Sequence, residues 1–376
     1  MDTSASWPAI DASAQPWLEV IEGDGRAGPS PLAARPARAL FAARVRPKPF
    51  DERRSYGWGW SPENVRQEAA ARQQQFLAGL HDEAQFSVRR VLAGPTVALH
   101  AWRDADRGGL ALSLLGGVDG LDGDDARARA LDLWHTVEAT FPYDYDVTPL
   151  TSSVEFQSLS GLGVLAGLSA PGEVVEIRRF ETRLPTERGV RLLLGVWQGD
   201  DRADEPVWRA LAAAPEGALL SIRLRPTRLT TGEWSRLEGV VARSPTDDAG
   251  LWPHAFDWAA DLYDRRQRAW GLPFLLQVHV AAPGGVALYL RRVLGGAFTH
   301  RAGAPAQPGY EALWPPDAAG AAAWQAALGR VGFTATPGGE ASLWPRLHLL
   351  ADMDEALTVF RWPYPPSSGL PGVTFL

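Results

Sequence analysis

"SSVEFQSL" (residues 152–159) and "TTGEWSRL" (residues 230–237) share the pattern hydroxyl-x-x-Glu-aromatic-x-x-Leu. The pattern is typical of a capping box at a helix N-terminus, in which the hydroxyl and the glutamate satisfy each other's backbone N–H groups. Each segment follows a predicted strand that ends near a proline, Pro149 or Pro226. Eight residues can match by chance, but two α+β modules of the split βαβ (ferredoxin-like) type in tandem would also produce the repeat, and we favour that interpretation.

Hydrophobic periodicity places further elements around these two segments. Strands are expected in "GLALSLLGG", "YDYDVTPL", "EVVEIRRFETR", "VRLLLGVWQ", "ALLSIRLRP" and "PFLLQVHVAA", and a hairpin in "QFSVRRVLAGPTVALHAWRD". Helices are expected over residues 61–80 and in "DDARARALDLWHTVEATF", "EPVWRALAAA", "HAFDWAADLYDRRQRAW", "GVALYLRRVLGGAF", "AAGAAAWQAALGRV" and "DMDEALTVF". We therefore expect an α+β fold with an extended arm (1–55, with a short strand around 39–45), a first module (56–170), a second module (171–300), and a C-terminal helical segment with a Pro/Gly-rich strap (301–376).

Composition excludes several classes of site. The 376 residues include no cysteine, so disulfides, zinc–thiolate sites and cysteine nucleophiles are excluded. The single lysine, Lys48, lies between prolines with no glycine-rich loop before it, so the chain lacks the motif of a phosphate-binding P-loop. The net charge of −7 argues against a general attraction to nucleic acid. The N-terminus lacks a signal-peptide pattern, and we expect a cytoplasmic protein without membrane insertion.

Few residues suggest chemistry. "GLGVLA" (161–166) fits a dinucleotide fingerprint, but it does not follow a strand, and we interpret it as a loop or helix end. The seven histidines show no metal-ligand spacing, and His279 in an apolar strand is expected to be a core or edge residue. We assign no catalytic, cofactor-binding or metal-binding residue. In "SIRLRPTR", Arg223 and Arg225 share one strand face and, with Arg228, form a candidate nucleic-acid contact.

The C-terminal stretch "VFRWPYPPSSGLPGVTFL" (359–376) combines aromatic residues with prolines that restrict the backbone. Such a segment loses little entropy on docking, so we expect a contact surface, against a partner or against the chain's own core. The candidate partner contacts are Arg361, Trp362, Pro363, Tyr364, Pro365, Pro366, Leu370 and Pro371.

The order of several segments resembles the N-terminal, non-ATPase region of HerA-like and type IV secretion (conjugative DNA-transfer) ATPases. The likeness spans most of residues 65–372 and rests on loose apolar patterns. They are "FLAGLHDEAQFSVRRVLAGPTVALHAW", "FPYDYDVTPLTSSVEF", "VVEIRRFETRL", "LSIRLRPTRLTTGEWSRL", "PFLLQVHVAA" and "DEALTVFRWPYPPSSGLPG". In that family such a strap leads into a RecA-like motor, whose nucleotide-binding lysine and aspartate have no counterpart here.

The resemblance implies a non-enzymatic scaffold without a cofactor. It would dock to a separate motor ATPase or self-associate into a collar, in DNA transfer or mobile-element defence. A second hypothesis is a nucleic-acid-binding adaptor that uses Arg223, Arg225 and Arg228. A third is an unrecognised hydrolase whose site is assembled in space.

Overall fold

The computed structural model describes most of the chain in separate stretches. They are residues 14–22, 37–48, 62–86, 94–104, 107–168, 170–186, 189–197, 204–214, 217–229, 231–235, 272–301, 308–334, 347–365 and 369–376.

The first half of the chain folds as a ferredoxin-like module. Its strands are ordered β5-β2-β4-β3 and all pair antiparallel. That order, with one helix between the first two strands and one between the last two, defines the split βαβ motif. The elements are β2 (Ala37–Pro47), α2 (Pro62–Phe86), β3 (Thr96–Asp104), β4 (Gly109–Gly120), α3 (Gly123–Thr140) and β5 (Tyr145–Pro149).

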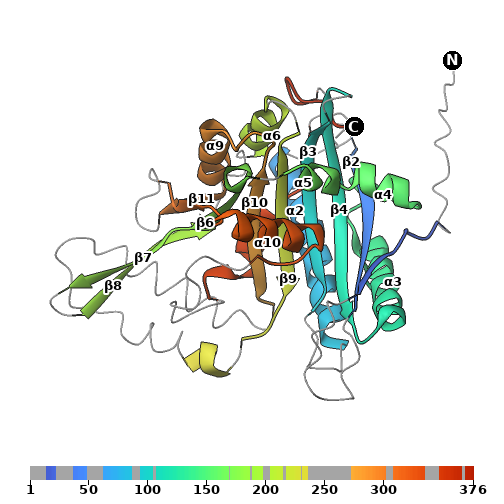
Figure 1. Cartoon of the computed structure of the whole chain (residues 1–376), viewed down its shortest axis with the longest axis horizontal. Helices are drawn as coiled ribbons and strands as arrows, with labels where there is room; N and C mark the ends of the chain where they lie inside the picture. Colours follow the sequence, from blue (N-terminus) through green and yellow to red (C-terminus); the bar gives the residue numbers. More distant parts are fainter. Residues whose placement is uncertain are drawn as a thin grey trace.

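The second half repeats this topology. Its strands are ordered β12-β6-β10-β9, again antiparallel. The elements are β6 (Val174–Arg179), α6 (Asp204–Ala212), β9 (Leu219–Pro226), β10 (Phe274–Ala281), α9 (Leu288–Phe298) and β12 (Tyr310–Leu313). A small sheet of β7 (Glu181–Thr186), β8 (Gly189–Trp197) and β11 (Thr299–Arg301) is inserted, and its β7–β8 hairpin extends away from the main sheet (Figure 1). The predicted α+β class and the ferredoxin-like modules are confirmed.

The two modules join edge to edge into one ten-stranded sheet. The join is the antiparallel pairing of β3 with β9, from Val97 opposite Leu224 to Trp102 opposite Leu219. β1 (Glu19–Glu22) adds to the outer edge at β2, and β13 (Leu350–Ala351) pairs with β10. A pseudo-twofold axis therefore runs between β3 and β9, with β2, β3 and β4 corresponding to β6, β9 and β10.

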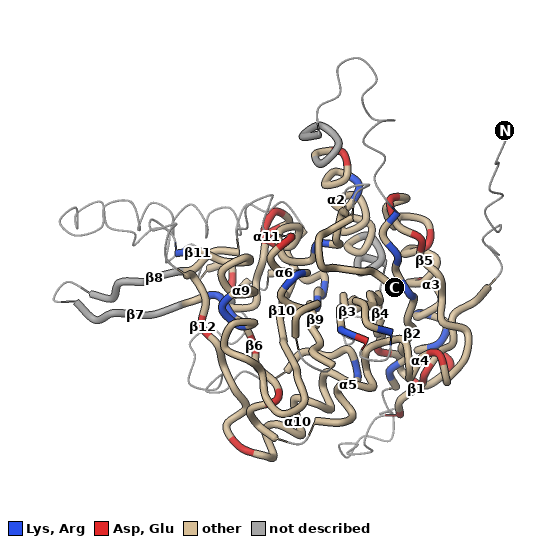
Figure 2. Tube along the Cα trace, turned by 90° about the horizontal axis from the view of Figure 1, so that it is seen from above, with Lys and Arg blue, Asp and Glu red and all other residues tan. Residues whose placement is uncertain are grey.

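The sheet has two unlike faces (Figure 2). One is covered by α2, α3, α6 and α9, the helices that belong to the modules, together with α11 (Met353–Val359), and carries the larger core. The other face, which this motif leaves bare, is covered by added segments: α4 (Ser153–Leu159) and α5 (Leu162–Ala166) after the first module, and α10 (Ala318–Gly329) after the second. The short 3₁₀ turns η1 (Pro171–Glu173) and η2 (Leu347–Leu349) complete the described elements.

Several sequence-based expectations need correction. β2 lies in the predicted extended arm and β12 beyond residue 300, so the strand pairing extends both modules past their predicted limits. α2 continues to Phe86, where the hairpin is predicted to begin, and the second strand of that hairpin is β3. Residues 87–93 lie outside the described part. The predicted helix at 254–270 also lies outside it.

The repeat that suggested two modules does not mark equivalent places in them. Ser152 caps α4 and accepts a hydrogen bond from the Glu155 amide, as predicted, although the Glu155 carboxylate accepts from Thr151 instead of completing the box. Thr230 lies outside the described residues, and residues 231–235 are helical. Because α4 follows the fourth strand of its module while residues 231–235 follow the second strand of theirs, the duplication argument from this repeat is wrong.

Candidate functional site

The C-terminal strap packs against its own chain. Trp362 is 1% exposed, and its ring lies 5.3 Å from that of Phe141 and 5.9 Å from that of Phe360, both edge to face. The Tyr145 hydroxyl donates to the Trp362 carbonyl at 3.4 Å. Trp362 therefore belongs to the core and is not a partner contact, because no partner can reach it in this conformation.

The remaining strap residues divide between core and surface. Pro363 and Pro365 are buried, Arg361, Tyr364 and Leu370 are half-buried, and Pro371 is exposed, while Pro366 lies outside the described residues. Further on, the Leu110 amide donates to the Thr374 carbonyl at 2.8 Å, and the Leu376 amide donates to the Leu110 carbonyl at 2.9 Å. The tail thus forms an isolated parallel β-bridge with the start of β4.

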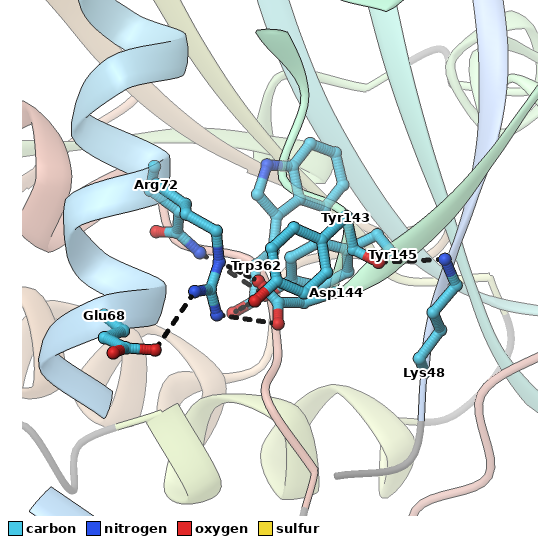
Figure 3. Close-up of polar contacts among 8 residues, drawn as sticks. Lys48, Glu68, Arg72, Tyr143, Asp144, Tyr145 and Trp362 are labelled. Carbon is cyan, nitrogen blue, oxygen red and sulfur yellow. Dashed lines mark hydrogen bonds and ion pairs between the residues drawn. The ribbon is translucent and has the colours of Figure 1, made fainter. Parts of the chain in front are cut away.

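A pinned turn lies next to the strap, between α3 and β5 (Figure 3). Arg72 of α2 makes a bidentate contact with Asp144, with nitrogen–oxygen distances of 2.7 and 2.8 Å. From the other side, Lys48 donates its backbone amide to the Asp144 carbonyl and its Nζ to the Tyr143 carbonyl, both at 2.8 Å. Bidentate charge-assisted contacts fix geometry well, so this turn is held rigidly on both sides.

The pinned turn presents an aromatic surface. Tyr143 is 68% exposed, and the Arg72 guanidinium lies 4.4 Å from its ring centre. Although burial acts to lower it, the hydrogen bond and charge of Asp144 raise the pKa of Arg72. Burial raises the pKa of the neighbouring Tyr364 to about 12, and the Asp144 carboxylate adds to that shift. We call Arg72, Tyr143 and Tyr364 the tyrosine platform.

The three candidate nucleic-acid arginines do not form an exposed stripe. Arg223 is fully buried under the segment that follows α10, where it donates to the Gly332 carbonyl and to His279 Nδ1. Arg225 is half-buried, donates to Thr96 Oγ1 at 3.0 Å and stacks on Phe333. Arg228 is exposed. In this arrangement Arg223 is not accessible to nucleic acid, because α10 and the segment that follows it cover that face of the sheet.

The covered face carries a row of polar side chains in cross-strand register. His100 is opposite Ser113 and Ser221, and His279 is opposite Ser221 and Glu176. All of them are at most 1% exposed. Since the described residues offer no hydrogen-bond partner to His100 Nε2, Ser221 Oγ or Glu176 Oε2, the row keeps unused polar capacity in its interior.

Burial controls the charge of this row. It lowers the pKa of His100 to about 3 and that of His279 well below its ordinary value, so both imidazoles are neutral. It raises the pKa of Glu176 to about 7 and lowers that of Arg223 to about 9. Arg223 is therefore the main positive charge of the row at neutral pH.

The same geometry bears on hydrolase chemistry. Ser221 lies between two histidines, the residue types of a nucleophile and its base. However, His279 Nδ1 is engaged by Arg223 at 2.7 Å and Nε2 by Thr334 Oγ1 at 3.0 Å, so this histidine has no nitrogen left for Ser221. His279 is a satisfied core residue, as the sequence indicated. The described residues contain no cluster of three or more His, Asp or Glu side chains arranged for a metal ion.

Sequence reasoning missed both the tyrosine platform and the polar row. "PYDYD" places two tyrosines next to acidic residues, a detectable signal for the platform. The row depends on strand register between residues far apart, which one sequence does not give. No helix in the described part of the chain combines the length and apolarity that a membrane crossing needs.

Comparison with known proteins adds no family. No protein-family model matches the chain, and no curated protein shows significant similarity to it.

Proposed function

We propose that this protein is a non-enzymatic scaffold that docks to a separate motor ATPase through the tyrosine platform. The observation that carries the proposal is the exposed Tyr143 ring, held over Arg72 by the pinned turn. Tyrosine and arginine are enriched among the residues that dominate binding energy in interfaces. A surface that is rigid before binding loses little conformational entropy when a partner covers it.

The identity of the partner follows from the resemblance to HerA-like transfer ATPases, whose N-terminal region precedes a RecA-like motor. A split arrangement would place the motor on another polypeptide. The ten-stranded sheet of the two fused modules would form the base on which such a motor docks. Lys48, the only lysine, does not belong to a nucleotide-binding loop: its Nζ contacts the Tyr143 carbonyl and the Asp146 carboxylate.

The test measures binding of a HerA-like motor domain that lacks its own N-terminal region, by isothermal titration calorimetry. Tyr143→Ala should weaken binding by at least tenfold, since hot-spot residues cost about 2 kcal/mol or more on truncation. The matched control is Tyr289→Ala on α9, where the tyrosine is 41% exposed and lies outside the platform. Equal effects of the two substitutions, or no micromolar binding by the wild type, would contradict the proposal.

Self-association is the competing outcome, and sedimentation velocity distinguishes it. If the protein forms a collar by itself through the platform, the wild type sediments as an oligomer and Tyr143→Ala as a monomer, with no motor present. With that result the tyrosine platform would remain the docking surface, but its partner would be a second copy of this chain and not a motor ATPase.

A further inference from the structure

The α10 segment, which belongs to neither module, covers the His279 end of the polar row, where the Trp324 ring lies 5.2 Å from the His279 ring. His100 and Ser113 lie instead against the carbonyl groups of Ser160 and Leu159, at the junction of α4 and α5. Of its residues only Ala321, Trp324 and Leu328 are buried, so its apolar attachment to the sheet is narrow. The turn over residues 330–334, which follows the helix, adds the buried Val331 side chain and several polar contacts. We call α10 and this turn the cover.

The turn contains a backbone conformation that its residue disfavours. Val331 has φ of 52°, and it is the non-glycine residue with positive φ in the described part of the chain. The Gly332 amide bonds the Ala327 carbonyl and the Val331 amide bonds the Leu328 carbonyl, which is a Schellman motif. Its left-handed position usually holds glycine, and a β-branched residue there is strained. Such strain is typical of clamps and switches.

Two arginines from distant strands hold this turn by its carbonyl groups. Arg38 of β2 donates Nε to the Arg330 carbonyl at 2.7 Å and Nη2 to the Val331 carbonyl at 3.0 Å. Arg223 of β9 donates Nη1 to the Gly332 carbonyl at 2.5 Å. Three successive carbonyl groups thus lie against two guanidinium groups, an arrangement that the oxygens of a phosphodiester backbone could take over. The Nη1 of Arg38 is in addition ion-paired with Asp119 at 2.6 Å.

Donors beneath the cover remain unused. Arg223 Nε and the Ser221 hydroxyl have no partner among the described residues, and both side chains are at most 1% exposed. A buried donor without an acceptor costs free energy, so a ligand that supplies acceptors there would gain from them. The closed cover therefore leaves some hydrogen-bond donors of the face beneath it without an acceptor.

We propose that the cover is displaceable and that the face beneath it, centred on Arg38, Arg223 and Ser221, binds the phosphate backbone of a single-stranded nucleic acid. In the closed state the carbonyl groups of residues 330–332 occupy the positions of phosphate oxygens. The two arginines share the carbonyl groups of three successive residues, so a chain of acceptors reproduces these contacts better than a single ion. This inference is independent of the tyrosine platform, which lies on the other face.

The test changes the stability of the cover without changing the face. Ala323 and Ala326 are not among the buried residues of α10, so replacing either with glycine weakens the helix and removes little contact with the sheet. A Cβ added at Gly329 would meet no atom within 4 Å, so Gly329→Ala strengthens the same helix. Ala128→Gly in α3, at an exposed position on the opposite face, is the matched control.

Binding is measured as the anisotropy of fluorescein-labelled oligothymidylate at several salt concentrations. Because apparent affinity scales with the open fraction, Ala323→Gly should tighten binding about fivefold and the double variant with Ala326→Gly roughly twentyfold. Gly329→Ala should weaken it about fivefold, and Ala128→Gly should leave it unchanged. No detectable binding by the double variant, or an equal gain with Ala128→Gly, would overturn the proposal.

Arg38→Gln in the doubly softened background separates a ligand contact from a structural clamp. A ligand contact predicts weaker binding and a salt slope shallower by about one. A clamp alone predicts a more open cover and tighter or equal binding, which would refute the assignment of Arg38. Inorganic pyrophosphate is the second probe. If pyrophosphate displaces the oligonucleotide with an affinity per phosphate group equal to that of the oligonucleotide itself, the site takes free phosphate and the nucleic-acid assignment is wrong.

Discussion

Replacing Trp362 with alanine should unfold the protein more easily, because the strap is part of the core. The indole is 1% exposed and meets Phe141, Tyr145 and Phe360 at ring separations of 5.3, 6.2 and 5.9 Å. Truncating a buried tryptophan costs about 3–5 kcal/mol, and each aromatic pair accounts for about 0.5–1.5 kcal/mol of such interactions. We expect a loss of about 4 kcal/mol, which is a large part of the roughly 5–15 kcal/mol that usually stabilises a domain.

The assay is urea unfolding followed by far-ultraviolet circular dichroism, which does not depend on tryptophan emission. Trp362→Phe should cost less than Trp362→Ala, since Trp362 Nε1 has no hydrogen-bond partner among the described residues and most of the packing is kept. Trp314→Ala is the matched surface control, because Trp314 is 41% exposed, and it should cost less than about 1 kcal/mol.

The result that refutes this reasoning is a small effect. If Trp362→Ala and Trp314→Ala cost the same, the strap does not contribute to the stability of the isolated chain. If Trp362→Ala also abolishes binding of a motor domain without lowering stability, Trp362 is a partner contact after all.

Three further outcomes are expected. Burial raises the pKa of Glu176 from 4.5 to about 7, so between these two pH values the folded chain holds a proton that the unfolded chain has released. The free energy of unfolding of the wild type, relative to that of Glu176→Gln, should therefore fall by up to about 3 kcal/mol as the pH rises through this range. Urea titrations at several pH values measure it. An equal difference at all pH values would show that Glu176 titrates normally. Gly109→Val should displace the tail, because a Cβ there would lie 2.6 Å from Leu376 Cδ2 and 2.9 Å from the Thr374 carbonyl oxygen. Hydrogen exchange of the amides of residues 374–376 should then become faster, and an unchanged exchange rate would contradict the placement of the tail. Finally, the chain should not bind ATP, since no P-loop presents backbone N–H groups to phosphates, and saturable micromolar binding in equilibrium dialysis would contradict this.

Local patterns predicted the elements but not how the modules meet. "ALLSIRLRP" and "PFLLQVHVAA" are predicted as strands because apolar and β-branched residues dominate them, and both form β strands. The pairing of β3 with β9 was not predictable, since it joins residues more than a hundred positions apart and any apolar strand could have been the neighbour. The modules were inferred from a repeat that lies at different places in the two halves, so the inference reached the right topology by an incorrect route.

The arginines show where the limits of a single sequence lie. Alternation correctly placed Arg223 and Arg225 on one face of β9, opposite Ile222 and Leu224. Whether that face is open or covered depends on α10, a segment about a hundred residues later with little amphipathic signal of its own. Exposure of a sheet face is a property of the assembled layers, and no pattern within the strand encodes it.

The two added segments differ in what holds them, and the difference has a consequence for function. The strap is attached by buried aromatic rings, with Trp362 at its centre, and apolar burial of this kind is not weakened by the ionic screening that acts on charges. The cover is attached by a narrow apolar stripe and by arginine contacts to carbonyl groups, which a ligand with stronger acceptors can replace. A partner on the platform would therefore meet a fixed surface, whereas a polyanion on the opposite face would have to compete with the chain's own backbone. The proposed scaffold would thus combine one permanent contact surface with one that opens only when a ligand supplies the missing acceptors.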